Sequence, residues 1–318
     1  MADRIAGLAF LFPGQGSQIT GMGKELAFNH AVARHTFEEA DEALGYSLSK
    51  LCFEGPDDQL RLTEITQPAI LTVSVAATRV LAEAGILPSF VAGHSLGEYS
   101  AHVAAGTISF ADAVRTVRNR GKYMQEAVPV GIGAMAAILA LGLVQIRSAC
   151  SEALFEFPGQ ICEPANINSP GQVVISGSKA AVERAAELCK GAGAKRAIML
   201  PVSAPFHCSL MQPAQDRLAA DLHALTFNNP EVPVLCNVEA AFVTDAAKSR
   251  DTLIRQVTGA VQWETSMQVL VAQGATRFLE AGPGSVLTGL LRQIDKSQSC
   301  VNVENEATLQ KAKALFAK

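Results

Sequence analysis

The segment Gly93-His94-Ser95-Leu96-Gly97 has the residue types and spacing of a serine nucleophile on a tight turn. It fits Gly-x-Ser-x-Gly, in which the flanking glycines let the chain bend sharply between a strand and a helix. An apolar run precedes it and a helical pattern follows. Such a turn exposes Ser95 at the carboxyl edge of a sheet, where the amide of Leu96 favours a developing oxyanion. The alternative is a glycine-flanked helix cap without a catalytic role.

A serine hydroxyl is a weak nucleophile and needs a base, and the chain has six histidines. Elimination leaves His207, in an irregular segment after a strand-like run. Of the others, two lie on a polar helix, one adjoins the serine, one lies about two turns up the next helix, and one is in an ordinary amphipathic segment (His30, His35, His94, His102 and His223). No acidic residue near His207 completes a triad, so a backbone carbonyl could orient the imidazole.

A second loop, Phe12-Pro-Gly-Gln-Gly-Ser-Gln18, follows the first apolar run. It fails the dinucleotide-binding fingerprint because Ile19 occupies the third glycine position, and the chain has no P-loop motif. A glycine-rich loop here could bring the backbone N–H of Gln15 to the substrate of the serine as a second oxyanion donor. The alternative is an ordinary tight turn.

Arg120 is the candidate cation of the site. It borders the apolar stripe of a predicted helix at 110–128, and a buried arginine usually needs an anionic partner. That partner is either a protein carboxylate or a substrate carboxylate held by two hydrogen bonds. Arg118 flanks the other edge of the stripe, so periodicity does not choose between the two arginines.

The elements that would position these residues alternate between strands and helices, which predicts an α/β fold with a mostly parallel, hydrolase-like sheet. Expected core strands are 8–12, 89–93, 233–238 and 277–279. Expected core helices are 23–44, a helix that starts at Pro68 and runs to about 84, 95–106 and 110–128, the last capped by Ser109.

Residues 132–202 have a different organisation. The pattern predicts, in order, a strand, a helix, two strands joined by the turn Asn168-Ser-Pro-Gly171, a second helix and a last strand. This order is typical of a ferredoxin-like unit. We therefore predict a small subdomain at 132–202, inserted into a core made of residues 1–131 and 203–318.

Composition excludes several classes of function. The chain has 318 residues, of which 49% are hydrophobic and 18% are charged, and its net charge of −4 gives no basic field for nucleic acid. Its seven cysteines are dispersed, which indicates thiols in a reducing compartment rather than a metal site. The apolar stretch 69–82 is short and interrupted by polar residues, so we expect no membrane span and a cytoplasmic protein.

Taken together, the motifs resemble the malonyl-CoA:acyl-carrier-protein transacylases of bacterial and organellar fatty acid synthesis. The resemblance covers nearly the whole chain. It rests first on the two segments already described, 12–18 and 93–97, the second of which extends through Glu98-Tyr-Ser100. The other motifs that support it are Arg120-Gly-Lys, Asn168-Ser-Pro-Gly-Gln172, Phe206-His207, Arg255-Gln256, Val261-Gln-Trp263 and Gly282-Pro-Gly284.

The resemblance implies catalytic roles. Ser95 matches the nucleophile and His207 the general base, while Leu96 and Gln15 match the two backbone oxyanion donors. Gln256 matches the residue whose backbone carbonyl orients the histidine, consistent with the missing acid.

The resemblance also implies the substrates and partners. Arg120 matches the arginine that clamps the malonyl carboxylate. Phe206 resembles the residue found before the histidine in the malonyl-selective type of the related polyketide acyltransferases, and its bulk should crowd an α-methyl branch. We expect malonyl-CoA and acyl carrier protein as partners, with no bound cofactor or metal, because coenzyme A is substrate and phosphopantetheine belongs to the carrier. We also expect a monomer. Ala260 departs from a proline found in many relatives. Alternatives are a malonyl loader of a polyketide pathway and a serine thioesterase or esterase.

Overall fold

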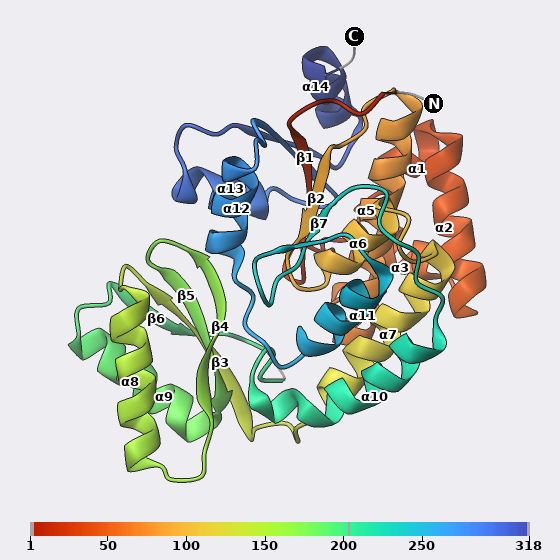
Figure 1. Ribbon diagram of the computed structural model, residues 1–318. Helices are drawn as coiled ribbons and strands as arrows, with labels where there is room; N and C mark the ends of the chain where they lie inside the picture. The colour runs from red at the N-terminus through yellow and green to blue at the C-terminus, as the bar shows by residue number, and fades with distance from the viewer. Residues whose placement is uncertain (1–2, 203, 317–318) are drawn as a thin grey trace.

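The computed structural model describes residues 3–202 and 204–316 and contains two β-sheets with helices packed against them (Figure 1). The larger sheet has the strand order β10-β9-β1-β2-β7-β8, and all neighbours are parallel except β7 and β8. This confirms the predicted mostly parallel α/β core. Its strands are β1 (Leu8–Phe12), β2 (Phe90–Gly93), β7 (Val234–Leu235), β8 (Phe242–Val243), β9 (Arg277–Ala281) and β10 (Cys300–Val303).

Both faces of the larger sheet are covered, which explains why β1 is apolar at every position. Leu8, Phe10 and Phe12 pack into one core, and the alternate residues Ala9 and Leu11 pack into another. The helices of this part are α1 (Lys24–Asn29), α2 (Ala31–Leu44), α3 (Leu48–Glu54), α4 (Asp57–Leu60), α5 (Thr63–Glu83), α6 (Gly97–Ala104), α7 (Phe110–Glu126), η1 (Ser209–Met211), α10 (Gln212–Ala224), α11 (Ala246–Arg255), α12 (Trp263–Ala272), α13 (Val286–Ile294) and α14 (Glu306–Phe316).

The smaller sheet is antiparallel with the order β4-β5-β3-β6, and it stands beside the larger one (Figure 1). With its two helices it makes the β-α-β-β-α-β arrangement of a ferredoxin-like unit and has its own apolar core. All six elements fall within the range predicted for the subdomain; Ser203, the first residue after that range, lies outside the described residues. They are β3 (Gly133–Leu139), α8 (Leu143–Glu156), β4 (Cys162–Ser169), β5 (Gln172–Ser178), α9 (Lys179–Gly191) and β6 (Arg196–Met199).

Several predicted boundaries are wrong. The helix expected at 23–44 is two helices, because His30 has an extended backbone with φ −124° and ψ 120°. Helix α5 begins at Thr63, so Pro68 lies inside it and leaves one carbonyl without its helical donor. The strand expected at 233–238 is shorter, at two residues. The prediction did not include β8 or β10, which occupy the two edges of the larger sheet.

Helix α5 also bears on the expectation about membranes. Its 21 residues are long and apolar enough to cross a membrane by length and composition, although the apolar stretch within it looked too short. In the fold, 78% of its most apolar window is buried against the rest of the protein. Packing in the core therefore accounts for its composition.

Candidate active site

Ser95 occupies a sharp turn between the end of β2 and the start of α6. Its φ of 51° is in the left-handed region, which serine rarely adopts. The flanking glycines allow this turn: a Cβ on Gly93 would lie 1.9 Å from the carbonyl carbon of Gly97, and one on Gly97 would lie 2.1 Å from the carbonyl oxygen of Phe12. The side-chain oxygen of Asn237 accepts a 2.6 Å hydrogen bond from the Ser95 N–H.

His207 meets Ser95 across 112 positions of sequence, with its Nε2 2.7 Å from the serine Oγ. Its Nδ1 lies 2.9 Å from the carbonyl oxygen of Gln256 and 3.2 Å from that of Gly259. Because a carbonyl can only accept, Nδ1 carries the proton and Nε2 is free to accept the serine proton. No aspartate or glutamate among residues 3–202 and 204–316 hydrogen-bonds to this imidazole, so the two carbonyls occupy the place of a triad acid.

The imidazole of His207 is held neutral. Its side chain is buried, with 3% of the residue exposed. Burial, together with the positive charge of Arg120, lowers the pKa of His207 to about 3. A neutral imidazole with an unprotonated Nε2 is the form that a general base requires.

Gln15 and Leu96 both line the cavity that contains Ser95. The Gln15 loop lies close to the elbow: a Cβ on Gly14 would be 2.5 Å from the carbonyl oxygen of His94. In the described part of the chain, the backbone amide of neither residue donates to a protein acceptor. Two free donors beside the serine are therefore able to bind an oxyanion.

Arg120 projects from α7 into the same cavity and is 2% exposed. It donates to the Oε1 of Gln67 at 2.8 Å, the Oε1 of Gln256 at 3.0 Å and the Oγ of Ser95 at 3.2 Å. None of the described carboxylates forms an ion pair with it, and burial lowers the pKa of its guanidinium. Arg118 instead lies over the ring of Tyr46, 5.5 Å from its centroid. The structure thus places Arg120, and not Arg118, in the cavity.

The cavity has a volume of about 150 Å³ and lies between the two sheets. The core contributes the residues already described, and the small subdomain contributes Met135, Asn166, Leu200 and Val202. Phe206, next to the catalytic candidate His207, lines it as well. An adjoining cavity of about 260 Å³ continues along the Gln15 loop towards α13. A long, narrow substrate could therefore extend from Ser95 between the two domains.

Of the remaining histidines, His94 lies with its Nε2 2.8 Å from the Oδ1 of Asn168. His30 is half-buried and paired with Glu306 rather than free on the surface. Among the described residues, no group of three or more histidine, cysteine, aspartate or glutamate side chains is arranged to hold a metal. All seven cysteines are unpaired thiols, and six of them are buried.

Several residues of the site carry no signal in the sequence. Asn237 and Gln67 touch the elbow and Arg120 respectively, yet each lies in a segment without a recognisable motif. Glu98 directly follows the elbow and is one of the residues of the extended motif. Its burial and its hydrogen bonds to Asn237 and Gln256 were not apparent from periodicity.

The elbow serine, the neutral imidazole and the free amides lie together at the carboxyl edge of an α/β sheet. This arrangement is typical of enzymes that transfer acyl groups. In agreement, the acyl transferase domain family matches residues 9–316.

Within that class, the chain belongs to the malonyl CoA-acyl carrier protein transacylases. It is 52% identical to the transacylase of Salmonella typhimurium, over 96% of this chain and 98% of that protein. It is 48% identical to the transacylase of Bacillus subtilis strain 168, over 96% of each. Among solved structures, an acyl carrier protein S-malonyltransferase from Vibrio cholerae is similar at a TM-score of 0.94 and 50% identity, over 96% of this chain and 100% of that one.

Proposed function

We propose that this protein transfers the malonyl group of malonyl-CoA to the phosphopantetheine thiol of acyl carrier protein. The observation that carries the proposal is the buried guanidinium of Arg120 beside the Ser95 hydroxyl. A cation without a carboxylate partner in the described part of the chain is suited to a substrate that brings its own. The names of the relatives support malonyl as that group.

The first half-reaction forms an ester on Ser95. His207 Nε2 accepts the hydroxyl proton as Oγ attacks the thioester carbonyl, and the amides of Gln15 and Leu96 stabilise the oxyanion. Each donor is worth about 3–4 kcal/mol at comparable sites. The C–S bond then breaks, and the coenzyme A thiolate takes the proton from His207. The carbonyl of Gln256 keeps the imidazole oriented throughout.

The second half-reaction reverses these steps. The carrier thiol gives its proton to His207 and attacks the ester, and Ser95 regains its proton as the new thioester leaves. Kinetics should be ping-pong. Support for a carrier partner comes from the solved complex entitled "type II PKS acyl-carrier protein in complex with its malonyl-transacylase", whose enzyme is 48% identical to this chain over 97% of its length at a TM-score of 0.94.

We further propose that the enzyme is a cytoplasmic monomer without a resident cofactor or metal, and without nucleic-acid or membrane partners. Fatty acid synthesis is the proposed pathway, following the transacylase names. The polyketide carrier in the similar complex favours a second candidate, a malonyl loader of a polyketide pathway. Transfer rates to fatty acid and polyketide carriers would separate the two pathways.

The deciding experiment is a malonyl-CoA transfer assay with purified carrier bearing its phosphopantetheine, scored by intact mass. We expect a malonyl adduct on the enzyme without carrier, and its disappearance with malonyl-carrier formation when carrier is added. Release of free malonate at the same rate with and without carrier would instead indicate a thioesterase. Absence of any enzyme adduct would contradict the proposal.

A further inference from the structure

Glu98, in the first turn of α6, is a fully buried carboxylate that the proposed chemistry does not use. Its Oε2 accepts two hydrogen bonds, from the backbone N–H of Asn237 at 2.9 Å and from the Nε2 of Gln256 at 2.7 Å. Its Oε1 has no partner among the described residues. One oxygen therefore joins three segments: the elbow helix, the loop after β7 and the end of α11.

Each partner of Glu98 holds a part of the site. Asn237 accepts from the Ser95 N–H and donates to the carbonyl oxygen of Gly93 at 2.7 Å, so it spans the elbow. The amide of Gln256 donates its Nε2 to the carbonyl oxygen of Ser95 at 2.9 Å and presents its Oε1 to Arg120 at 3.0 Å. The Oε2 of Glu98 already accepts from the Asn237 N–H, so it acts as an acceptor here and the Nε2 of Gln256 faces it. The Oε1 then faces Arg120.

The buried setting of Glu98 fits this role. Its carboxylate and the guanidinium of Arg120 contact opposite ends of the same amide. Burial raises the pKa of Glu98 to about 7, while its hydrogen bonds and the charge of Arg120 act in the opposite direction. Burying an acid is unfavourable, and both hydrogen-bond partners of Glu98 belong to the site. The packing of the core alone therefore does not explain why an acid stands here.

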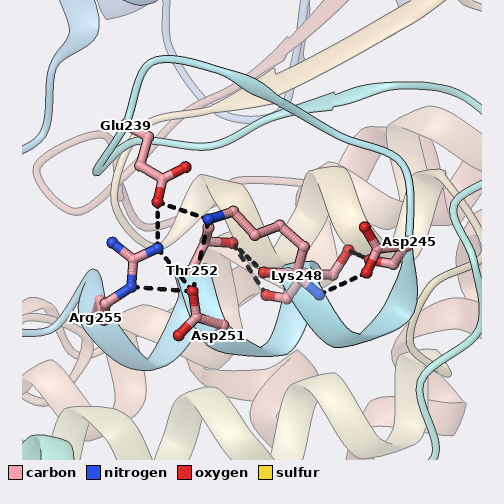
Figure 2. Close-up of polar contacts among 7 residues, drawn as sticks. Glu239, Asp245, Lys248, Asp251, Thr252 and Arg255 are labelled. Atoms are coloured by element: carbon pink, nitrogen blue, oxygen red, sulfur yellow. Dashed lines mark hydrogen bonds and ion pairs between the residues drawn. The ribbon is translucent and has the colours of Figure 1, made fainter.

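A second connection joins the same two segments on the outside of the protein (Figure 2). Glu239, two positions after Asn237, pairs with Arg255, the residue before Gln256, and with Lys248 at 2.7 Å. Side chains of this cluster are between 32% and 51% exposed, so salt screens their attraction and each pair contributes little. The buried connection through Glu98 is the one that reaches the reacting groups.

We propose that Glu98 is a positioning residue for malonyl transfer: by accepting from Asn237 and Gln256 it holds the serine elbow and sets the face that Gln256 presents to Arg120. This inference rests on the proposed function, because it assigns Arg120 to the substrate carboxylate. It places the selectivity for carboxylated acyl groups partly in a residue that does not touch the substrate.

The test compares Glu98→Ala and Glu98→Gln for the ratio of malonyl to acetyl acylation rates, measured by single-turnover intact mass. The alanine removes the oxygen that accepts both hydrogen bonds, so the ratio should fall about tenfold or more, as expected for two lost hydrogen bonds. The glutamine keeps one oxygen that can accept both bonds, so its ratio should remain within about threefold of wild type. A ratio unchanged in Glu98→Ala, or equally low in Glu98→Gln, would overturn the proposal.

If Glu98→Ala does not fold, Glu98→Asp tests the same contact. It keeps the carboxyl group but withdraws it by about one bond length, about 1.5 Å. The ratio should fall as for alanine, and an unchanged ratio overturns the proposal.

Two controls separate positioning from stability. Glu280→Gln alters an equally buried carboxylate that accepts from the N–H groups of Leu287 and Thr288, and Glu239→Gln breaks the outer connection. Both should leave the ratio unchanged in the folded fraction, whatever happens to thermal stability. A ratio that falls as far in Glu280→Gln as in Glu98→Ala would overturn the proposal. Failure of wild type to form a malonyl adduct would refute the proposed function itself and is read before any variant.

Discussion

Replacing Arg120 with alanine should remove the preference for malonyl over acetyl groups. The guanidinium lies among the residues that line the cavity and lacks a carboxylate partner in the described structure. A substrate carboxylate held by two charge-assisted hydrogen bonds gains about 1.5–3 kcal/mol from each. Losing both should cost about 3–6 kcal/mol, which lowers kcat/KM for malonyl-CoA by about 10²–10⁴-fold.

The ratio of the two donors is the informative quantity. Removing Arg120 also deprives the Oε1 atoms of Gln67 and Gln256 and the Oγ of Ser95 of a donor, and that loss affects acetyl and malonyl transfer alike. Dividing kcat/KM for malonyl-CoA by that for acetyl-CoA cancels the shared loss. Arg118→Ala is the matched control, because Arg118 lies on the same helix but outside the cavity, and its ratio should match wild type. An Arg120→Ala enzyme that still transfers acyl groups with the wild-type ratio would refute the carboxylate clamp.

Four further outcomes are expected. Ser95→Ala should abolish the malonyl adduct seen by intact mass, and a persisting adduct would show that another residue is the nucleophile. Because the pKa of His207 is lowered to about 3, single-turnover acylation should lose no activity through protonation of this imidazole above about pH 4. A loss of acylation that follows a pKa near 6.5, and that hydrolysis of the substrate does not explain, would contradict this prediction. The pKa of Glu98 is raised from 4.5 to about 7, so the native state holds a proton that the unfolded state releases, and stability should fall as pH rises through this window; thermal unfolding of Glu98→Gln should lack that component, and parallel curves would count against it. Phe206→Ala should widen the cavity and raise methylmalonyl transfer relative to malonyl transfer, as scored by competition. An unchanged ratio would show that Phe206 does not select against the methyl branch.

Local sequence was sufficient for the elbow, for the elements of the small subdomain and for the core helices that flank the elbow, but it did not predict the core helices after residue 207. Glycines at fixed distances from Ser95 specify a turn that only a residue without a side chain permits, and the flanking apolar patterns specify the strand and the helix. The failures were of the opposite kind. The edge strand β10 and the two-residue β7 carry little periodicity of their own, because they form by pairing with strands far away in the chain.

The fold decided which side chains contact one another at the site. Periodicity left Arg118 and Arg120 equivalent, and only the packing of α7 turned one towards Tyr46 and the other into the cavity. The contacts of Glu98 with Asn237 and Gln256 span 139 and 158 positions. No local pattern encodes such a contact, because it exists only once the sheet has brought the ends of its strands to one edge. The chain thus carries its proposed nucleophile in a short run of residues, whereas the side chains that surround it come from distant segments that meet in space.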